Sequence, residues 1–249
     1  MKATPLFRVL PILFILVLAP GAARAQVTLQ VGGGAGVAMP VSDYAGSTID
    51  FYTGVKYGLS TGFNLHGKAR VGVLGFRVTG EVSYSSFSNS GDAEPGQGSV
   101  DVSQKILGFR AGPEFHLGLP IVPLTPYIGA NVALNRFSGQ VTFQGVSKIS
   151  SGTFDLQSTT RIGFGFSAGA IISLGTLTSL DLGVSYNLMN ANGKAWEDVN
   201  PTQDQRLDSY LALNDAKDPL YKAGDDKHFV GNARKANAVE VTATLMFGL

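Results

Sequence analysis

The residues from Val239 to Leu249 alternate strictly between two kinds of side chain. One face carries Val239, Val241, Ala243, Leu245, Phe247 and Leu249, and the other carries Glu240, Thr242, Thr244, Met246 and Gly248. A period of two residues over this length predicts a half-buried β-strand. Such a strand leaves open backbone donors and acceptors unless both of its edges are paired. We therefore expect it to pair with the first strand and close a barrel.

The first 25 residues predict export. Lys2 and Arg8 give a positive start, an apolar run follows over 9–19, and Ala23-Arg24-Ala25 forms a small-x-small cleavage pattern. A membrane anchor is the alternative, but the run is shorter than the roughly 20 residues of a spanning helix. We predict a secretory signal peptide over 1–25 and a barrel domain over 26–249.

Composition excludes several classes of function. The formal net charge of +1 gives no argument for binding nucleic acid. The chain has no cysteine, so neither disulfides nor thiol chemistry contributes to stability or function.

Seven further segments alternate in the same way and are predicted as strands. Their expected ranges are 27–39, 53–65, 71–85, 102–117, 126–137, 161–174 and 180–190, with a tight turn at 66–68 and a polar loop over 86–98. Short connections follow the second, fourth and sixth strands, and longer ones follow the others. This pattern predicts an all-β fold, an eight-stranded antiparallel up-and-down transmembrane β-barrel with short periplasmic turns and long external loops.

The glycines decide which face lines the barrel. They share one face of the alternating segments with the charged residues, and bulky apolar residues occupy the other face. The interior of an eight-stranded barrel is just wide enough for side chains to fill, whereas a soluble ligand-binding barrel would place its bulky apolar face inside. We expect a polar lumen with an ion-pair network, in preference to a gate or proton path. Its predicted members are Lys56, Arg77, Glu81, Arg110, Glu114 and Asp181, and Glu240 shares their face.

Aromatic residues are expected at both rims of a lipid-facing band about 25 Å high. The predicted girdle comprises Tyr52, Tyr84 and Tyr186 near the long loops, and Phe63, Phe76, Phe115, Tyr127 and Phe247 near the short turns.

No pattern indicates catalysis, a metal site or a cofactor. The three histidines, His66, His116 and His228, are not placed with a serine on the lipid face, as acyl transfer would require. The glycines at 32–36 lack the spacing of a nucleotide-binding loop. The carboxylates within 191–235 do not match a calcium loop.

Two connections are candidates for contact with a surface partner. Segment 138–160 is expected to extend two strands above the membrane as a hairpin, whose edge could pair with a foreign strand. Segment 191–235 is expected to be a solvated surface loop. The alternative is a short helix that starts near Asn200-Pro201, with Leu207, Tyr210 and Leu211 on one face, and covers the mouth. Arg234 and Lys235 are candidate contacts for lipid-A phosphates.

Four runs resemble the OmpA-like and OmpX-like small outer-membrane barrels. They are residues 36–44, 126–132, 164–170 and the terminal strand. The resemblance implies a place in the cell outer membrane, with outer-membrane lipids including lipopolysaccharide and the barrel assembly machinery as partners. Such barrels usually end on an aromatic residue, whereas this sequence ends Phe247-Gly248-Leu249.

The predicted role is structural, surface-interacting or adhesive, without enzyme activity and without an open general pore. A narrow channel for small or hydrophobic solutes, resembling the OmpW kind, is the first alternative. A lipid-modifying barrel enzyme is the second.

Overall fold

The computed structural model describes residues 27–73, 75–118, 124–197, 205–222 and 230–248. The predicted signal peptide and its cleavage site lie outside these residues. No described helix is long and apolar enough to cross a membrane.

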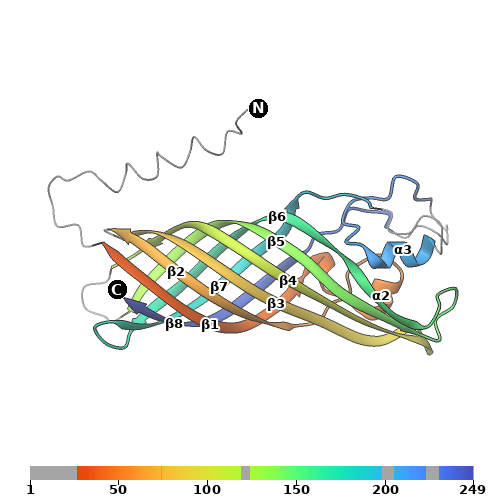
Figure 1. Cartoon of the computed structure of the whole chain (residues 1–249), viewed down its shortest axis with the longest axis horizontal. Helices are drawn as coiled ribbons and strands as arrows, with labels where there is room; N and C mark the ends of the chain where they lie inside the picture. The colour runs from red at the N-terminus through yellow and green to blue at the C-terminus, as the bar shows by residue number, and fades with distance from the viewer. Residues whose placement is uncertain (1–26, 74, 119–123, 198–204, 223–229, 249) are drawn as a thin grey trace, which may run out of the picture.

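Eight antiparallel strands close into one barrel, and each strand pairs with its neighbours in sequence (Figure 1). The strands are β1 (Thr28–Val41), β2 (Gly62–Val73), β3 (Phe76–Glu94), β4 (Gln97–His116), β5 (Leu124–Gln144), β6 (Gly152–Ser173), β7 (Thr178–Asn192) and β8 (Asn237–Gly248). The last strand closes the barrel on the first, with Val31 opposite Phe247 and Val37 opposite Val241. The predicted fold and its closing pair are therefore confirmed.

An apolar belt surrounds the part of the barrel that contains the start of β1 and the end of β8, which pair with each other. We use this name for the exposed apolar side chains that point outward at every second strand position. On β4 they include Leu107, Phe109 and Phe115, and on β5 they include Ile128 and Val132. From Leu107 to Phe115 the strand advances by eight residue steps, or about 26 Å along its own axis. A belt of this kind fits the hydrocarbon layer of a membrane.

Strands β3 to β6 continue past the belt as a taller sheet. We call this part the mouth extension, and it comprises residues 86–94, 97–105, 137–144 and 152–160. The prediction of a polar loop over 86–98 is wrong, because β3 and β4 pair up to Glu94 and Gln97 around a two-residue turn. Gly96 has a φ of +72°, which a glycine adopts without strain. The predicted hairpin over 138–160 is confirmed by β5 and β6.

The second strand begins later than predicted. Two glycines, Gly54 and Gly58, have φ values of +72° and +66° and interrupt an extended backbone. Residues before Gly62 therefore belong to the long β1–β2 connection, which contains α2 (Thr48–Tyr52). The predicted turn at 66–68 is also wrong, since this segment lies within β2 and the strand ends at Val73.

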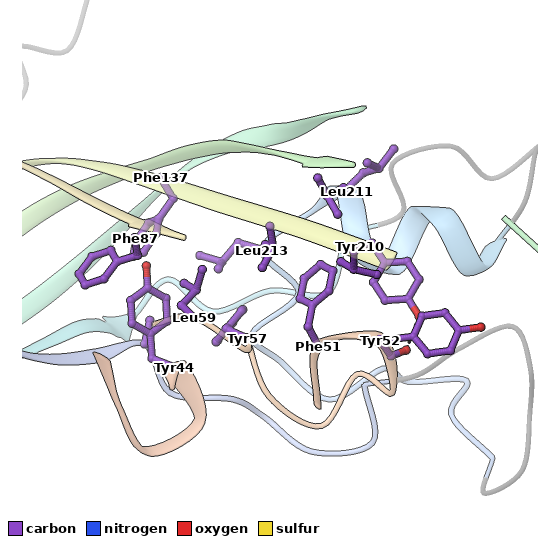
Figure 2. Close-up of a cluster of buried hydrophobic side chains, with 14 of the residues drawn as sticks. Tyr44, Phe51, Tyr52, Tyr57, Leu59, Phe87, Phe137, Tyr210, Leu211 and Leu213 are labelled. Atoms are coloured by element: carbon purple, nitrogen blue, oxygen red, sulfur yellow. Dashed lines mark hydrogen bonds between the residues drawn. The ribbon is translucent and has the colours of Figure 1, made fainter. Parts of the chain in front are cut away.

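The mouth extension surrounds an apolar core, which is shown in Figure 2. We call residues 44–59 and 207–213 the plug, because they fill this space from the side opposite the sheet. Helix α3 (Gln205–Leu211) supplies Tyr210, whose ring lies 5.3 Å from Phe51 and 5.2 Å from Phe143 of β5. The plug therefore seals one end of the barrel, the end that carries α2 and α3 in Figure 1.

Candidate functional site

The lumen inside the apolar belt contains two clusters of buried charge. Alternation along each strand places polar residues inward wherever apolar ones face outward. Apart from Arg161, which pairs with Asp215 in the mouth, four cations and four carboxylates of the described strands point into the barrel. They are Lys68, Arg70, Arg77, Arg110, Glu81, Glu114, Asp181 and Glu240. Balanced charges in so narrow a space favour ion pairing, because an unpaired buried charge is costly.

The first cluster is organised by Arg70 of β2. Its Nε lies 2.6 Å from Glu114 Oε2, and its Nη2 lies 2.8 Å from Asp181 Oδ2. Lys68 Nζ lies 3.1 Å from the same Asp181 oxygen. The Tyr127 hydroxyl donates to the other Asp181 oxygen at 2.8 Å. Strands β2, β4, β5 and β7 are thus tied together across the lumen.

The second cluster is organised by Arg110 of β4. Its guanidinium contacts both oxygens of Glu240, at 2.6 and 2.9 Å, and Glu81 at 3.2 Å. The Ser85 hydroxyl donates to Glu240 at 3.3 Å, and Asn64 donates to Ser85 at 3.0 Å. This network crosses from β4 to β8 and β3, and then reaches β2.

Little open volume separates the two clusters. A cavity of about 50 Å³ is lined by residues of both, including Lys68, Glu81 and Arg110. Glycines allow this close packing, since a Cβ on Gly169 would lie 2.6 Å from the Tyr127 hydroxyl. The cavity has room for a few water molecules.

The structure places four of the six predicted lumen residues in the two charge clusters. The other two, Arg77 and Lys56, lie outside these clusters. Glu81 and Arg110 share one cluster, and Glu114 and Asp181 share the other. Arg77 also faces the lumen, where its Nη1 donates to Gln30 at 2.8 Å. Lys56 was assigned to the lumen wrongly, because it lies in the β1–β2 connection before β2 begins.

Sequence reasoning missed the cations of β2. Lys68 and Arg70 were hidden by the misplaced turn at 66–68. A usable signal was present, since Asn64, His66, Lys68 and Arg70 alternate with apolar or small residues from Phe63 to Val73.

The predicted girdle is only partly at the surface of the belt. Phe76 and Phe115 lie opposite each other at the short-turn end, and Phe247, Tyr84 and Tyr186 also occupy outward-facing strand positions. Phe63 is the second residue of β2, at the end of the strand nearer the mouth, and its ring centroid lies 6.1 Å from that of Tyr84, so its assignment to the short-turn rim is wrong. Two other assignments fail because the side chains are buried: Tyr52 lies in the plug and Tyr127 in the lumen.

Buried polar contacts fix the described part of segment 191–235 in the mouth. Arg161 Nε of β6 lies 3.1 Å from Asp215 Oδ2, which also accepts from Asn190 at 3.0 Å. The Arg234 guanidinium lies 4.2 Å from the centre of the Tyr57 ring. Burial raises the pKa of Tyr57, which keeps its hydroxyl neutral.

These contacts correct two predictions. Residues 207–215, Asp218, Val230 and Arg234 are buried, so the expectation of a solvated surface loop is wrong for this part of the segment, and helix α3 covers the mouth instead. The predicted helix start at 200–203 lies outside the described residues. Arg234 is 5% exposed and cannot reach a lipid phosphate, whereas Lys235 is exposed.

The described histidines take part in packing within the lumen. His66 Nε2 lies 2.7 Å from Thr244 Oγ1, and His116 Nε2 lies 3.1 Å from Glu114 Oε2. His228 lies outside the described residues. Among the residues that are described, no group of three or more His, Asp or Glu side chains is placed to hold a metal ion.

Three solved structures have a similar overall arrangement at low sequence identity. Neisserial surface protein A is 16% identical with a TM-score of 0.45, and the match covers 89% of this chain and 95% of that one. OprG from Pseudomonas aeruginosa is 10% identical with a TM-score of 0.45, and the match covers 90% of this chain and 97% of that one. Ail of Yersinia pestis, in complex with the heparin analogue sucrose octasulfate, is 12% identical with a TM-score of 0.36, and the match covers 91% of this chain and 99% of that one. A comparison with curated proteins found no match.

A sequence model of the outer membrane protein beta-barrel domain matches residues 10–205. The match covers more than half of the chain and agrees with the closed barrel and its apolar belt. The chain belongs to the family of outer membrane protein β-barrel domains.

Proposed function

We propose that this protein is a closed outer-membrane barrel that acts at the cell surface through its mouth extension, without transporting solutes along its lumen. The observation that carries the proposal is the plug, because within the described part of the chain an apolar core fills the barrel mouth, where ions would need water to pass. Phe87, Val100 and Phe143 of the sheet and Tyr44 of the plug are each fully buried there.

The lumen beneath the plug supports the same conclusion. Its ion-pair clusters leave the cavity of about 50 Å³ between them. Arg70 and Glu240 are each 1% exposed. A barrel of eight strands has an interior that side chains fill, whereas aqueous channels belong to barrels with many more strands.

The mouth extension has the properties of a contact surface. Its outward face is polar, with Gln140 donating to Asp155 at 2.8 Å and Thr142 lying 2.9 Å from Thr153. Its inner face packs against the plug, with the Phe143 ring 5.2 Å from that of Tyr210. In the described part of the chain, β6 pairs with β7 only from Ile162 onward. Residues 152–161 therefore pair with β5 along one edge and have no β7 partner along the other. An edge of this kind accepts a foreign strand.

Two measurements test the proposal. The folded protein in planar bilayers is expected to show no single-channel conductance, and regular conductance steps would refute closure. Cells that display the protein are expected to adhere through the outward face, so the triple variant Q140A/T142A/D155A should reduce adhesion. A control variant at an exposed residue of the β7–β8 connection, K217Q, should not reduce adhesion. Equal adhesion of the triple variant and the parent would refute the surface role.

A sideways passage for hydrophobic compounds is a second candidate, favoured by a break in the β4–β5 ladder. Pairing stops at Ala111 and resumes at Glu114, because Pro113 has no N–H to donate. A groove of about 430 Å³ lies against the break, lined by Pro113, Asn131 and Phe166 among others. Ala111 and Asn131 also line the lumen cavity.

Liposome uptake of a hydrophobic dye tests this second candidate. Replacing Pro113 with Ala supplies the missing N–H and should close the break. Lower dye uptake by P113A than by the parent supports a passage between β4 and β5. Absence of uptake by both proteins refutes the passage and leaves the surface role of a closed barrel as the proposed function.

We further propose that the protein is exported with a cleaved signal peptide and that it has no enzyme activity. Release of residues 1–25 should leave Gln26 as the first residue, which sequencing of the mature protein checks. Assembly machinery of the outer membrane is the proposed partner for insertion. The described histidines pack in the lumen, away from lipid acyl chains. Expression should therefore leave the mass of lipid A unchanged, and a shift would favour a lipid-modifying enzyme.

A further inference from the structure

Two cations lie where the apolar belt ends and the mouth extension begins. On the outward face of β4, Leu107 is followed by Lys105, and on β5 Leu134 is followed by Arg136. Both cationic residues are exposed. Each is therefore the first residue beyond the hydrocarbon-facing run of its strand, at the level of lipid headgroups.

The sheet register places these two cations next to each other. Lys105 lies opposite Ser138, and Arg136 lies opposite Leu107. They are therefore diagonal neighbours on the same face, with Cα atoms roughly 7–8 Å apart. Their flexible side chains can converge on one anion between the strands.

The charge pattern along the outward face singles out this level. Among the described strand residues, Lys105 and Arg136 are the only cations that point outward, and neither makes an ion pair with another described residue. The outward carboxylates lie farther from the belt, and they are Asp92, Glu94, Asp101 and Asp155. Asp101 is four residues above Lys105, or about 13 Å along the strand. The rim is thus positive and the upper sheet negative.

Hydroxyl groups flank both cations. Lys105 has Ser86 on one side and Ser138 on the other, and Arg136 has Thr160 beside it on β6. Hydroxyls donate to and accept from sugar hydroxyls, and guanidinium and ammonium groups bind phosphate. The combination fits a headgroup that carries both sugar and phosphate.

We propose that Lys105 and Arg136 form a binding site for the phosphate of an outer-leaflet glycolipid, with Ser86, Ser138 and Thr160 contacting its sugar. The site replaces the predicted lipid contact at Arg234, which is buried in the mouth. It is independent of whether the barrel conducts, because it lies on the lipid-facing side of the sheet.

Titration of the folded protein in detergent with bisphosphorylated lipid A tests the site. The double variant K105Q/R136Q should bind about 30-fold more weakly, since each cation near an anionic lipid surface contributes about 1 kcal/mol and every 1.4 kcal/mol is a factor of ten. The matched control K217Q/K222Q removes two exposed cations outside the belt and should bind as the parent does. Heat-modifiable gel mobility checks that every variant is folded.

Two further probes identify the ligand class. Lipid A without phosphates should bind the parent as weakly as bisphosphorylated lipid A binds K105Q/R136Q. Phosphatidylglycerol carries a phosphate without a sugar ring, and should bind the parent more weakly than bisphosphorylated lipid A. Equal losses in K105Q/R136Q and K217Q/K222Q would overturn the proposal, as would equal affinity for the two phosphorylated lipids.

Discussion

The belt-covered half of the barrel and the mouth extension use one backbone in two opposite ways. On β4 the odd-numbered residues point outward along the whole strand. Within the belt Phe109 points outward while Arg110 points inward. In the mouth extension Asp101 points outward while Val102 points inward. The alternation is unbroken, yet the chemistry of the two faces exchanges near Lys105. The exchange marks the level at which the barrel leaves lipid for water.

Different forces hold the two halves together. In the mouth extension the outside is water, so burial of Val100, Phe143 and the plug aromatics gives the usual hydrophobic stabilisation. In the belt the outside is hydrocarbon, so apolar side chains gain little by moving inward. Stability there rests on closed backbone pairing and on charges that satisfy one another in the lumen. Substitutions should therefore have opposite consequences in the two halves.

The largest effect is expected from Arg70→Met in the belt-covered half. Removing this guanidinium leaves Glu114 and Asp181 buried, with Lys68, His116 and the Tyr127 hydroxyl as their remaining partners among the described side chains. Breaking a buried pair by removing one partner costs about 4 kcal/mol. Urea unfolding of the protein in lipid bilayers, followed by tryptophan fluorescence or gel mobility, measures the loss.

A double variant serves as its control. In R70M/E114Q one cation and one carboxylate are removed together and the pair between Lys68 and Asp181 remains, so most of the lost stability should return. If R70M alone unfolded like the parent, the ion pairs would not be what holds the belt-covered half together.

A smaller and local effect is expected from Tyr210→Ala in the plug. The Tyr210 ring packs on Phe51 and Phe143, and its hydroxyl donates to the Tyr52 carbonyl. Truncating a buried aromatic side chain costs about 3 kcal/mol. Because the belt has its own pairing, the loss should appear as faster proteolysis and hydrogen exchange in the mouth alone. Uniform destabilisation of both halves would show that they do not behave as separate units.

A lysine placed on each outward face of β5 compares the two environments directly. Val132 is 53% exposed and lies opposite Ala111 near the middle of the belt, and Gln140 points outward in the mouth extension. V132K should cost about 2 kcal/mol, because a cation on the lipid face must reach an interface. Q140K should change stability by less than about 0.5 kcal/mol, since it remains in water beside Asp155. Similar values for the two variants would place the membrane boundary elsewhere.

The sequence allowed the barrel, its closing pair and the polarity of its lumen to be predicted, because strict alternation is a local property. It did not reveal where the outside solvent changes. Residues 86–98 contain many polar groups and were expected to form a loop, although Phe87 and Ala93 keep the strand period of β3. Recognising them as strands requires knowing that the plug supplies an apolar interior at that height.

The plug itself depends on contacts distant in sequence. Tyr52 and Tyr210 are 158 residues apart and stack with ring centroids 6.1 Å from each other. Tyr57 and Leu59 alternate like strand residues, although the left-handed backbone at Gly54 and Gly58 interrupts the extended chain before β2. The alternation therefore predicts a strand at 53–65 where the structure has part of the plug, and the stacking of Tyr52 on Tyr210 leaves no periodic signal that would separate Tyr52 from a girdle residue.

The smallest effect is expected at the start of α2, where the mouth responds to acid. Ser47 and Asp50 form a capping box, with Asp50 N donating to Ser47 Oγ at 3.1 Å and Ser47 N donating to Asp50 Oδ2 at 2.9 Å. The hydrogen bond from the Ser47 backbone lowers the pKa of Asp50 below its usual value, against a smaller opposing effect of burial. A lowered pKa in the folded state means that the stabilisation is present above about pH 4 and is lost as the pH falls through the folded value.

Asp50→Asn should therefore cost about 0.5 kcal/mol at neutral pH and nothing once the carboxyl of the parent is protonated. Hydrogen exchange of α2, measured in both proteins from pH 7 to pH 3, should converge at the acid end while the β1–β8 pairing stays unchanged; a difference that persisted at low pH would mean that the carboxylate charge is not what caps the helix.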